Sequence, residues 1–211
     1  MKEESITRNI IKMNEYFCEM NEAAQRIDLE TIEQAIKILY DAWLSGSKVF
    51  IVGNGGSAST ASHFVCDLSK TTIVDGKKRC KVISLLDNIP LISALTNDEG
   101  FEKIYDEQLK AHLEPGDVVI AISVHGGSGQ GNASKWSQNL LRAIDYANVI
   151  GASTIGLSGF DGGAMVDLCD ICIVAPIDST PHVESMHLTI EHLVCERLKV
   201  MIEESDEGYI S

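Results

Sequence analysis

Two segments of the sequence carry imidazole and carboxylate groups at helical spacing. In GSASTASHFVCDLSK, His63 and Asp67 stand four residues apart, so on a helix their side chains share one face. The segment HVESMHLTIEHLVCERL holds further groups of these two kinds, which are Glu184, His187, Glu191 and His192. Imidazoles and carboxylates bind zinc, and they are also common proton-transfer groups in catalysis. The two segments could therefore form a metal site with two histidines and two carboxylates, or a general acid–base pair, or only exposed polar faces on an acidic protein.

A glycine-rich turn precedes the first of these segments. The stretch VFIVGNGGS runs from an apolar strand into Asn54, Gly55, Gly56 and Ser57. Glycines permit positive φ and close approach of the backbone, and Ser57 is suited to cap the helix, so that free N–H groups at the helix start can meet an anion. The turn lacks the third glycine of a dinucleotide-binding fingerprint and the Gly-Lys-Ser/Thr of a P-loop, so we expect no nucleotide cofactor. Taken alone, it is compatible with a phosphate site and with a tight structural turn.

A second loop of the same kind follows a later strand. The stretch ISVHGGSGQGNASKWSQ is dense in small hydroxyl residues and leads into a helix that is expected to begin near Ser137. Its serines are Ser123, Ser128, Ser134 and Ser137. Two serine-rich loops at one edge of a sheet suit a phosphate ester that is held by hydroxyls and backbone amides. For residues 129–135 the alternative is a surface loop without a ligand.

The rest of the pattern predicts the elements that position these loops. Short, β-branched, nearly continuous apolar runs begin at residues 48, 80, 117, 153 and 171, as expected of strands buried on both faces. Helical stretches lie between and after them, at residues 57–69, 88–96, 101–113, 137–149, 161–167 and 182–203. This alternation predicts an α/β fold with a three-layer, doubly wound, five-stranded parallel sheet. Such sheets bind ligands beyond the carboxyl ends of their strands, which is where both serine-rich loops begin.

Two further helices are predicted before the first strand, at residues 4–24 and 28–46. The second carries apolar residues at helical spacing, which are Ile32, Ala35, Ile36, Leu39 and Trp43. A complete α/β domain would leave such stripes with nothing to cover. We therefore expect residues 1–46 to form a helical hairpin that serves oligomerisation by packing into a bundle with a partner subunit.

The composition limits the partners and the compartment. With 211 residues, of which 45% are hydrophobic, the chain can bury a sizeable core. Its formal net charge of -14 argues against nucleic acid and anionic membrane as main partners, because both bind through clustered Lys and Arg. No apolar run reaches the roughly 18 residues of a membrane span, and the first residues lack the pattern of a signal peptide. Because the six cysteines also show no disulfide spacing, we expect a cytoplasmic protein.

Five motifs, in this order along the chain, resemble the sugar isomerase (SIS) domain family: GNGGSASTASHF, ALTNDEGFEKIY, GDVVIAIS, TIGLSGFDGGAM and VESMHLTIEHL. The resemblance runs from about Leu39 to Lys199, and within the family it is to the sedoheptulose-7-phosphate isomerases, also called phosphoheptose isomerases. It implies a flavodoxin-like sheet with residues 47–211 as the SIS domain, and a homotetramer with active sites between subunits. It also implies an intramolecular oxidoreductase that interconverts ketose and aldose phosphates through an enediol, with zinc as the cofactor.

The resemblance also implies roles for individual residues. Asp67 and His192 match the positions that transfer protons, and zinc would be held by His63, Asp67, Glu184 and His192. Substrate contacts would fall on four parts of the chain, which are Asn54, Gly55, Gly56 and Ser57, then Asn97 and Asp98, then Ser123, Val124, His125, Ser128 and Ser137, and finally Glu184.

Departures from the family pattern bear on the substrate. The family has Glu where this chain has the shorter Asp67, and it has Gln where this chain has Glu184. Its Ser-Thr-Ser after the third strand is Ser-Val-His at residues 123–125 here, followed by an insertion that ends near Trp136. The expected reaction converts sedoheptulose 7-phosphate to D-glycero-D-manno-heptose 7-phosphate. The alternatives are an isomerase of another long-chain sugar phosphate such as an octose phosphate, and a non-catalytic SIS protein that binds a sugar phosphate or a protein; Asp67 and His192 favour an enzyme.

Overall fold

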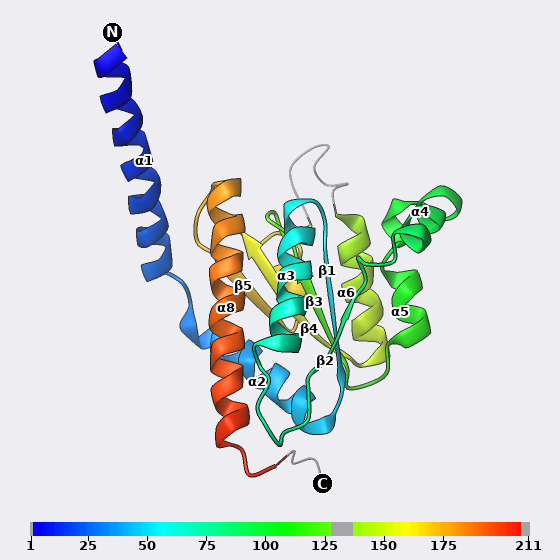
Figure 1. Ribbon diagram of the computed structural model, residues 1–211. Helices are drawn as coiled ribbons and strands as arrows, with labels where there is room; N and C mark the ends of the chain where they lie inside the picture. Colours follow the sequence, from blue (N-terminus) through cyan, green and yellow to red (C-terminus); the bar gives the residue numbers. More distant parts are fainter. Residues whose placement is uncertain (1, 128–136, 208–211) are drawn as a thin grey trace.

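The computed structural model describes residues 2–127 and 137–207, with side chains from residue 5 onward. Ser128 and the expected insertion at residues 129–135 therefore lie outside the described residues. Figure 1 shows a central sheet enclosed by helices, with the first helix extending away from it. None of the helices in the described ranges has the length and apolar character that a membrane crossing requires.

The centre of the fold is a parallel sheet of five strands in the order β2-β1-β3-β4-β5, which confirms the predicted architecture. The strands are β1 (Lys48–Gly53), β2 (Lys81–Ser84), β3 (Val118–Ile122), β4 (Ser153–Gly159) and β5 (Ile171–Ala175). β1 and β3 pair in register from Val49 opposite Val118 to Gly53 opposite Ile122, so the two strands end at the same level. The chain leaves β1 toward β2 on one side and returns to β3 on the other, and such a reversal is where flavodoxin-like sheets bind ligands.

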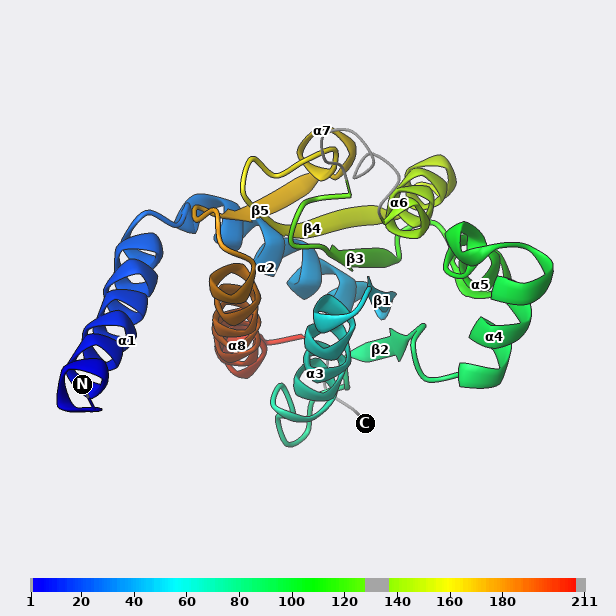
Figure 2. The ribbon, with the colours of Figure 1, turned by 90° about the horizontal axis from the view of Figure 1, so that it is seen from above.

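Helices cover both faces of the sheet (Figure 2). One layer contains α2 (Leu29–Ser45), α3 (Gly56–Lys70) and α8 (Thr180–Glu204), and the other contains α5 (Asp106–His112), α6 (Gln138–Ile150) and α7 (Met165–Leu168). The connection from β2 to α5 forms α4 (Ile89–Asp98) and a 3₁₀ helix, η1 (Phe101–Lys103). Side chains of a strand alternate between these layers, so that Ile51 and Ile120 pack in the first core while Phe50 and Val119 pack in the second.

The second helix, α2, belongs to the core of the domain. Asp28 caps its start by accepting hydrogen bonds from the backbone N–H groups of Glu30 and Thr31. Its apolar residues are buried against the sheet and α8, and they are Ile32, Ala35, Ile36, Leu39, Ala42 and Trp43. The expectation that this stripe needs a partner subunit is therefore wrong, because the stripe covers the domain's own sheet.

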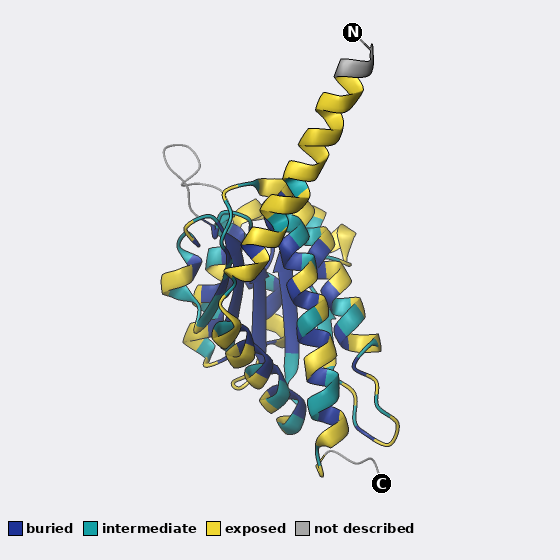
Figure 3. Cartoon of the chain, turned by 90° about the vertical axis from the view of Figure 1, so that its left-hand side faces the viewer, coloured by how far each residue is buried: buried dark blue, intermediate teal, exposed yellow. Residues whose placement is uncertain are grey.

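The first helix, α1 (Lys2–Gln25), projects from the body and is exposed along nearly its whole length (Figure 3). Ile6, Ile10, Met13 and Phe17 recur at intervals of four, three and four residues, and all are more than half exposed. The ring of Tyr16 stacks on His182 of α8 with 3.9 Å between ring centroids. The apolar stripe without a partner in this chain is thus on α1.

Candidate active site

A cavity of about 150 Å³ lies at the carboxyl ends of β1 and β3. Its polar lining comes from the β1–α3 turn, the loop after β3, the start of α6 and the first turns of α8, and consists of Asn54, Ser57, Ser123, His125, Ser137 and Glu184. Val124, another predicted contact, lines the same cavity. The structure therefore brings together seven of the residues that were expected to contact substrate, at the point of the sheet where ligands bind in such folds.

The turn from β1 to α3 is tight because glycines occupy its crowded positions. A Cβ on Gly53 would collide with the backbone of Ser57, and Gly55 has a φ of +56°, which L-residues rarely adopt. Gly55 is the N-cap residue of α3, and no side chain caps this helix. The expectation that Ser57 is the cap is therefore wrong, since Ser57 lies in the first turn, is buried and lines the cavity. An uncapped helix start beside a cavity is suited to an anion.

The loop after β3 is held in place by its own backbone and by an aromatic ring. The hydroxyl of Ser123 accepts a hydrogen bond from the backbone N–H of Gly127 at 3.2 Å. The imidazole of His125 packs on the ring of Phe160, with 4.3 Å between ring centroids. These contacts fix the Ser-Val-His tripeptide at the wall of the cavity.

Asn54 joins the two sides of the cavity. Its side-chain amide exchanges two hydrogen bonds with the amide of Asn139 in α6, each 2.9 Å long. The hydroxyl of Tyr105 donates to the carbonyl of Gly53, and burial raises the pKa of this hydroxyl well above its usual range. Neither Asn139 nor Tyr105 was predicted as a site residue: Asn139 lies outside the five motifs, and Tyr105, the last residue of ALTNDEGFEKIY, has no spacing that indicates a contact.

Some predicted contact residues lie elsewhere. Gly55 lines an adjoining cleft on the other side of the turn. Asn97 and Asp98 are exposed at the end of α4, where the Asn97 amide donates to the Asp98 carboxylate at 2.6 Å. The cavity lining formed by the described residues of one chain does not include them, because α4 lies beyond the edge strand of the sheet. Ser128 is outside the described residues.

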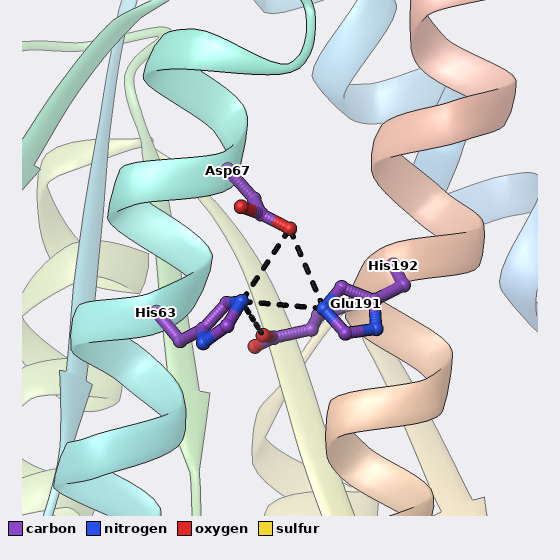
Figure 4. Close-up of side chains that lie close together, drawn as sticks. All are labelled: His63, Asp67, Glu191 and His192. Carbon is purple, nitrogen blue, oxygen red and sulfur yellow. Dashed lines mark hydrogen bonds and ion pairs between the residues drawn. The ribbon is translucent and has the colours of Figure 1, made fainter.

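Imidazole and carboxylate groups from α3 and α8 converge outside the lining of this cavity, as Figure 4 shows for the four side chains. His63 Nε2 lies 3.2 Å from His192 Nε2. Asp67 Oδ2 lies 3.6 Å from His63 Nε2 and 3.5 Å from His192 Nε2. The prediction that His63 and Asp67 share one helix face is confirmed, and the two helices bring three candidate proton-transfer or metal-binding groups together.

Glu191 enters the same cluster from α8. Its Oε1 lies 3.9 Å from His63 Nε2. The side chain is fully buried, and neither carboxylate oxygen has a hydrogen-bond partner among the described residues. Burial, with a smaller contribution from the charge of Asp67, raises the pKa of Glu191 to about 8. A carboxylate in this position is costly unless a positive charge or a donor satisfies it.

The four residues fit a divalent cation such as zinc. Two imidazole nitrogens and two carboxylate oxygens lie within 4.8 Å of one another, and these atoms are typical zinc ligands. Zinc binds such ligands tetrahedrally at about 2.0–2.1 Å, which places ligand atoms about 3.3 Å apart. The distances among His63, Asp67 and His192 are 3.2 to 3.6 Å. Zinc, which the family resemblance implies, is therefore compatible with this donor set.

Glu184, predicted as a metal ligand, is not in this group. A Cβ on Gly56 would collide with the Glu184 carboxylate, so this carboxylate lies beside the start of α3. Eight residues of α8 separate Glu184 from His192, and this corresponds to about 12 Å along the helix axis. The carboxylate that α8 contributes to the cluster is instead that of Glu191.

His187 lies on the same helix but is buried away from the cluster. Its Nε2 donates to the carbonyl of Ser158 at 2.9 Å, while Nδ1 has no hydrogen-bond partner among the described residues. Because the charged form is disfavoured by burial, the pKa of His187 is lowered to about 4. His187 is thus a neutral core histidine at physiological pH.

We expect His187 to make the fold sensitive to acid. Between its unfolded pKa of about 6.5 and its folded pKa of about 4, the unfolded chain binds a proton that the folded chain does not. His187 should therefore lower the free energy of unfolding as the pH drops through this window, by on the order of 3 kcal/mol in total, whereas the raised pKa of Glu191 acts in the opposite direction. Urea unfolding between about pH 7 and pH 4 should show a shallower fall for His187→Gln than for the wild type. The exposed His112→Gln variant is the control, and equal pH dependence of the wild type and His187→Gln would contradict the prediction.

Comparison with known proteins relates this geometry to a family. A family model described as "SIS domain" matches residues 15–159. The chain is 45% identical over 163 residues to the lincomycin biosynthesis protein LmbN of Streptomyces lincolnensis, which covers 75% of this chain and 58% of LmbN. It is 35% identical over 167 residues to a phosphoheptose isomerase of Aliarcobacter butzleri, which covers 79% of this chain and 83% of that protein. The chain thus spans little more than half of LmbN and most of the isomerase.

The same likeness holds in three dimensions. A solved structure of a phosphoheptose isomerase from Francisella tularensis superimposes with a TM-score of 0.80 at 25% sequence identity. The match covers 93% of this chain and 98% of the other. The likeness therefore includes the sheet, both helical layers and the helices that carry the cluster.

Proposed function

Because this chain belongs to the SIS domain family, we propose that it is an aldose–ketose isomerase of a sugar phosphate. The substrate that we propose is sedoheptulose 7-phosphate, which is converted to D-glycero-D-manno-heptose 7-phosphate through an enediol. One observation carries the proposal: α3 and α8 each contribute to both the serine-lined cavity and the imidazole–carboxylate cluster. An anion site and acid–base groups along one pair of helices can act on the two ends of one extended substrate.

The cavity supplies groups that suit the phosphate. Ser57, Ser123 and Ser137 offer hydroxyl donors, whereas the start of α3 is faced by the Glu184 carboxylate. His125 adds a ring N–H donor at the same wall. Binding energy from the phosphate would fix the orientation of the sugar at the distant reacting carbons.

Asp67 and His192 are the groups that we propose for proton transfer between C1 and C2, one as base and the other as acid. Asp67 Oδ2 and His192 Nε2 are 3.5 Å apart, so both can reach adjacent atoms of one substrate. The side chains of His63 and His192 are 47% and 50% exposed, which leaves the cluster open to a ligand. Zinc held by this cluster would supply Lewis-acid polarisation of the substrate carbonyl. An atom that binds the ion cannot transfer a proton at the same time, so the metal and acid–base roles of Asp67 and His192 compete.

A second candidate is an isomerase of another long-chain sugar phosphate, such as an octose phosphate. The chain is more similar to a lincomycin biosynthesis protein, at 45% identity, than to the phosphoheptose isomerase, at 35%, which supports a substrate other than sedoheptulose 7-phosphate without specifying it. The cavity wall also presents Val124 and His125 at positions where the family resemblance implies hydroxyl residues. These residues would change the contacts to the substrate without removing the proton-transfer groups.

Incubation of the protein with sedoheptulose 7-phosphate, with and without added zinc, tests the proposal. We expect an aldose heptose 7-phosphate as product, identified by NMR. A parallel incubation with an eight-carbon ketose phosphate separates the two candidates, because turnover of that compound alone would select the second. If the folded, zinc-loaded protein turned over neither compound, both assignments of the substrate would be wrong.

We also propose a homotetramer with active sites between subunits, in which α1 supplies a subunit contact. The support is the stripe of Ile6, Ile10, Met13 and Phe17, whose spacing is that of helices that pack in bundles. An exposed stripe of this length is unusual for a helix that has no partner.

Replacing Met13 and Phe17 with Glu is expected to convert the tetramer to smaller species, because four or more added charges would then face one another at the helix contact. Light scattering coupled to size-exclusion chromatography measures the mass. Arg8→Glu is the control, since Arg8 is exposed and lies on the opposite side of α1. A monomeric wild type, or a double variant with the mass of the wild type, would contradict the proposed contact.

A further inference from the structure

We propose that Glu191 is the second carboxylate ligand of a divalent cation in this protein, and that Glu184 contacts the substrate in the cavity instead. The proposal rests on the proposed function only for the role of the cation and for the substrate contact. Cation binding itself can be measured without substrate.

The environment of Glu191 lacks the groups that a buried carboxylate needs. It is 0% exposed, and both of its oxygens are without hydrogen bonds among the described residues. Its one charged partner within 4.0 Å in that part of the chain is the imidazole of His63. A single imidazole at 3.9 Å does not offset the desolvation of a carboxylate, whereas a divalent cation does.

Asp67 also has no permanent positive charge beside it among the described residues. Its ion pairs within the described residues are with His63 and His192, and neither is with Lys or Arg. Two carboxylates and two imidazoles therefore share one small region without a permanent positive charge. The donor atoms nonetheless point toward a common centre, as Figure 4 shows. Close carboxylates repel one another when both are charged, and a bound cation would remove that repulsion.

The distances among ligand atoms within one chain also favour Glu191 over Glu184 as the metal ligand. Glu191 Oε1 belongs to the group of donor atoms that lie within 4.8 Å of one another, and Glu184 does not. Glu191 and His192 are consecutive residues of α8, and a ligand atom of each lies in the group formed with His63 and Asp67. Glu184 lies about two turns away, with its carboxylate against Gly56 at the cavity.

The position of Glu184 gives it a different chemistry. A carboxylate accepts hydrogen bonds and donates none when ionised, so it suits the hydroxyl groups of a sugar and repels a phosphate. It shares the cavity with Ser57, Ser123 and Ser137, which supply the donors that a phosphate needs. Glu184 would thus fix which part of the substrate lies beside α8.

Titration of the metal-free protein with Zn²⁺ and Co²⁺ tests the ligand assignment. We expect Glu191→Gln to weaken Zn²⁺ binding about 100-fold, the upper end of what changes around metal ligands cause. It should also change the visible spectrum of the Co²⁺ form, which reports the number and type of ligands. Glu184→Gln should bind Zn²⁺ within about twofold of the wild type and leave the Co²⁺ spectrum unchanged, while raising KM for the substrate. Glu196→Gln, an exposed carboxylate on the same helix, is the matched control.

Thermal unfolding separates a ligand from a structural residue. Glu191→Leu removes the unsatisfied carboxyl, so the metal-free variant should melt at or above the temperature of the wild type, and zinc should no longer raise its Tm. If Glu191→Leu lowered the Tm of the metal-free protein but kept the full zinc-induced increase, Glu191 would be structural and the proposal wrong. Loss of zinc binding in Glu184→Gln and its retention in Glu191→Gln would overturn it as well. The Zn²⁺ titration, the Co²⁺ spectrum and the Tm need no substrate, so they do not depend on whether the isomerase assay succeeds.

Discussion

Replacing Asp67 with Asn is expected to lower kcat of the proposed isomerisation about 100- to 10,000-fold. The change keeps the size of the side chain but removes its charge and its ability to take a proton. The imidazoles of His63 and His192 lie 3.6 and 3.5 Å from Asp67 Oδ2, so the variant loses the carboxylate from the centre of the cluster. KM should change much less, because the serine-lined cavity does not include Asp67. Initial rates at saturating substrate measure the effect, with the zinc content of each protein determined in parallel.

The controls separate proton transfer from metal loss. His192→Ala should show a loss of the same order, and Asp75→Asn, an exposed aspartate beyond the end of α3, should keep the kcat of the wild type. A low kcat at full zinc occupancy indicates proton transfer, and a rate that recovers with excess zinc indicates a ligand. If Asp67→Asn and His192→Ala both kept full activity on a substrate of the wild type, the proposed proton-transfer pair would be wrong.

Gly53→Ala is expected to lower the free energy of unfolding by about 3 kcal/mol. A Cβ at this position would collide with the backbone carbonyl of Ser57, and backbone cannot move aside as the end of a side chain can. The start of α3 would have to shift, which would displace Ser57 in the cavity and weaken substrate binding together with the fold. Urea unfolding followed by circular dichroism measures the stability, and KM reports the displacement.

Gly151→Ala is the matched control for this change. Gly151 ends α6 with a φ of +84°, and a Cβ there would meet nothing within 4 Å. Only the backbone conformation then opposes alanine, at a cost of about 1 kcal/mol, with no effect on KM. If Gly53→Ala and Gly151→Ala lost the same amount of stability, the collision with the backbone of Ser57 would not be the reason for glycine at position 53.

The sheet and its helices could be predicted because each has a strong local signal. Runs such as the one from Val118 to Ile122 are apolar throughout, as strands covered on both faces must be, and the alternation with helices requires parallel crossovers. The same reasoning placed the ligand site beyond β1 and β3. The role of α2 was not predictable, since an apolar stripe on a helix is identical whether it covers its own sheet or a partner.

The sequence indicated which residue types form the candidate site, but not which carboxylate of α8 lies beside the residues of α3. The spacing of His63 and Asp67 fixes their shared face, because both lie on one helix. Which carboxylate of α8 meets them depends on the rotation of α8 against α3, and this is set by the packing of two helices far apart in sequence. Both Glu184 and Glu191 precede His192 on that helix, so spacing alone could not choose between them. Asn139 was missed for a similar reason, as its pairing with Asn54 depends on the tertiary structure.

Because Glu184 and His192 lie on one uninterrupted helix, α8 would fix the separation between the cavity and the proposed proton-transfer groups. The rise of about 1.5 Å per residue separates the backbone positions of Glu184 and His192 by about 12 Å along the axis of α8. Inserting one residue into α8 would lengthen this separation by about 1.5 Å but would also turn one end by about 100°, which would misalign every group beyond it. Selection for a longer or shorter sugar therefore has to act through the loops at the cavity. The loop after β3 is one of the places where this chain departs from the family pattern.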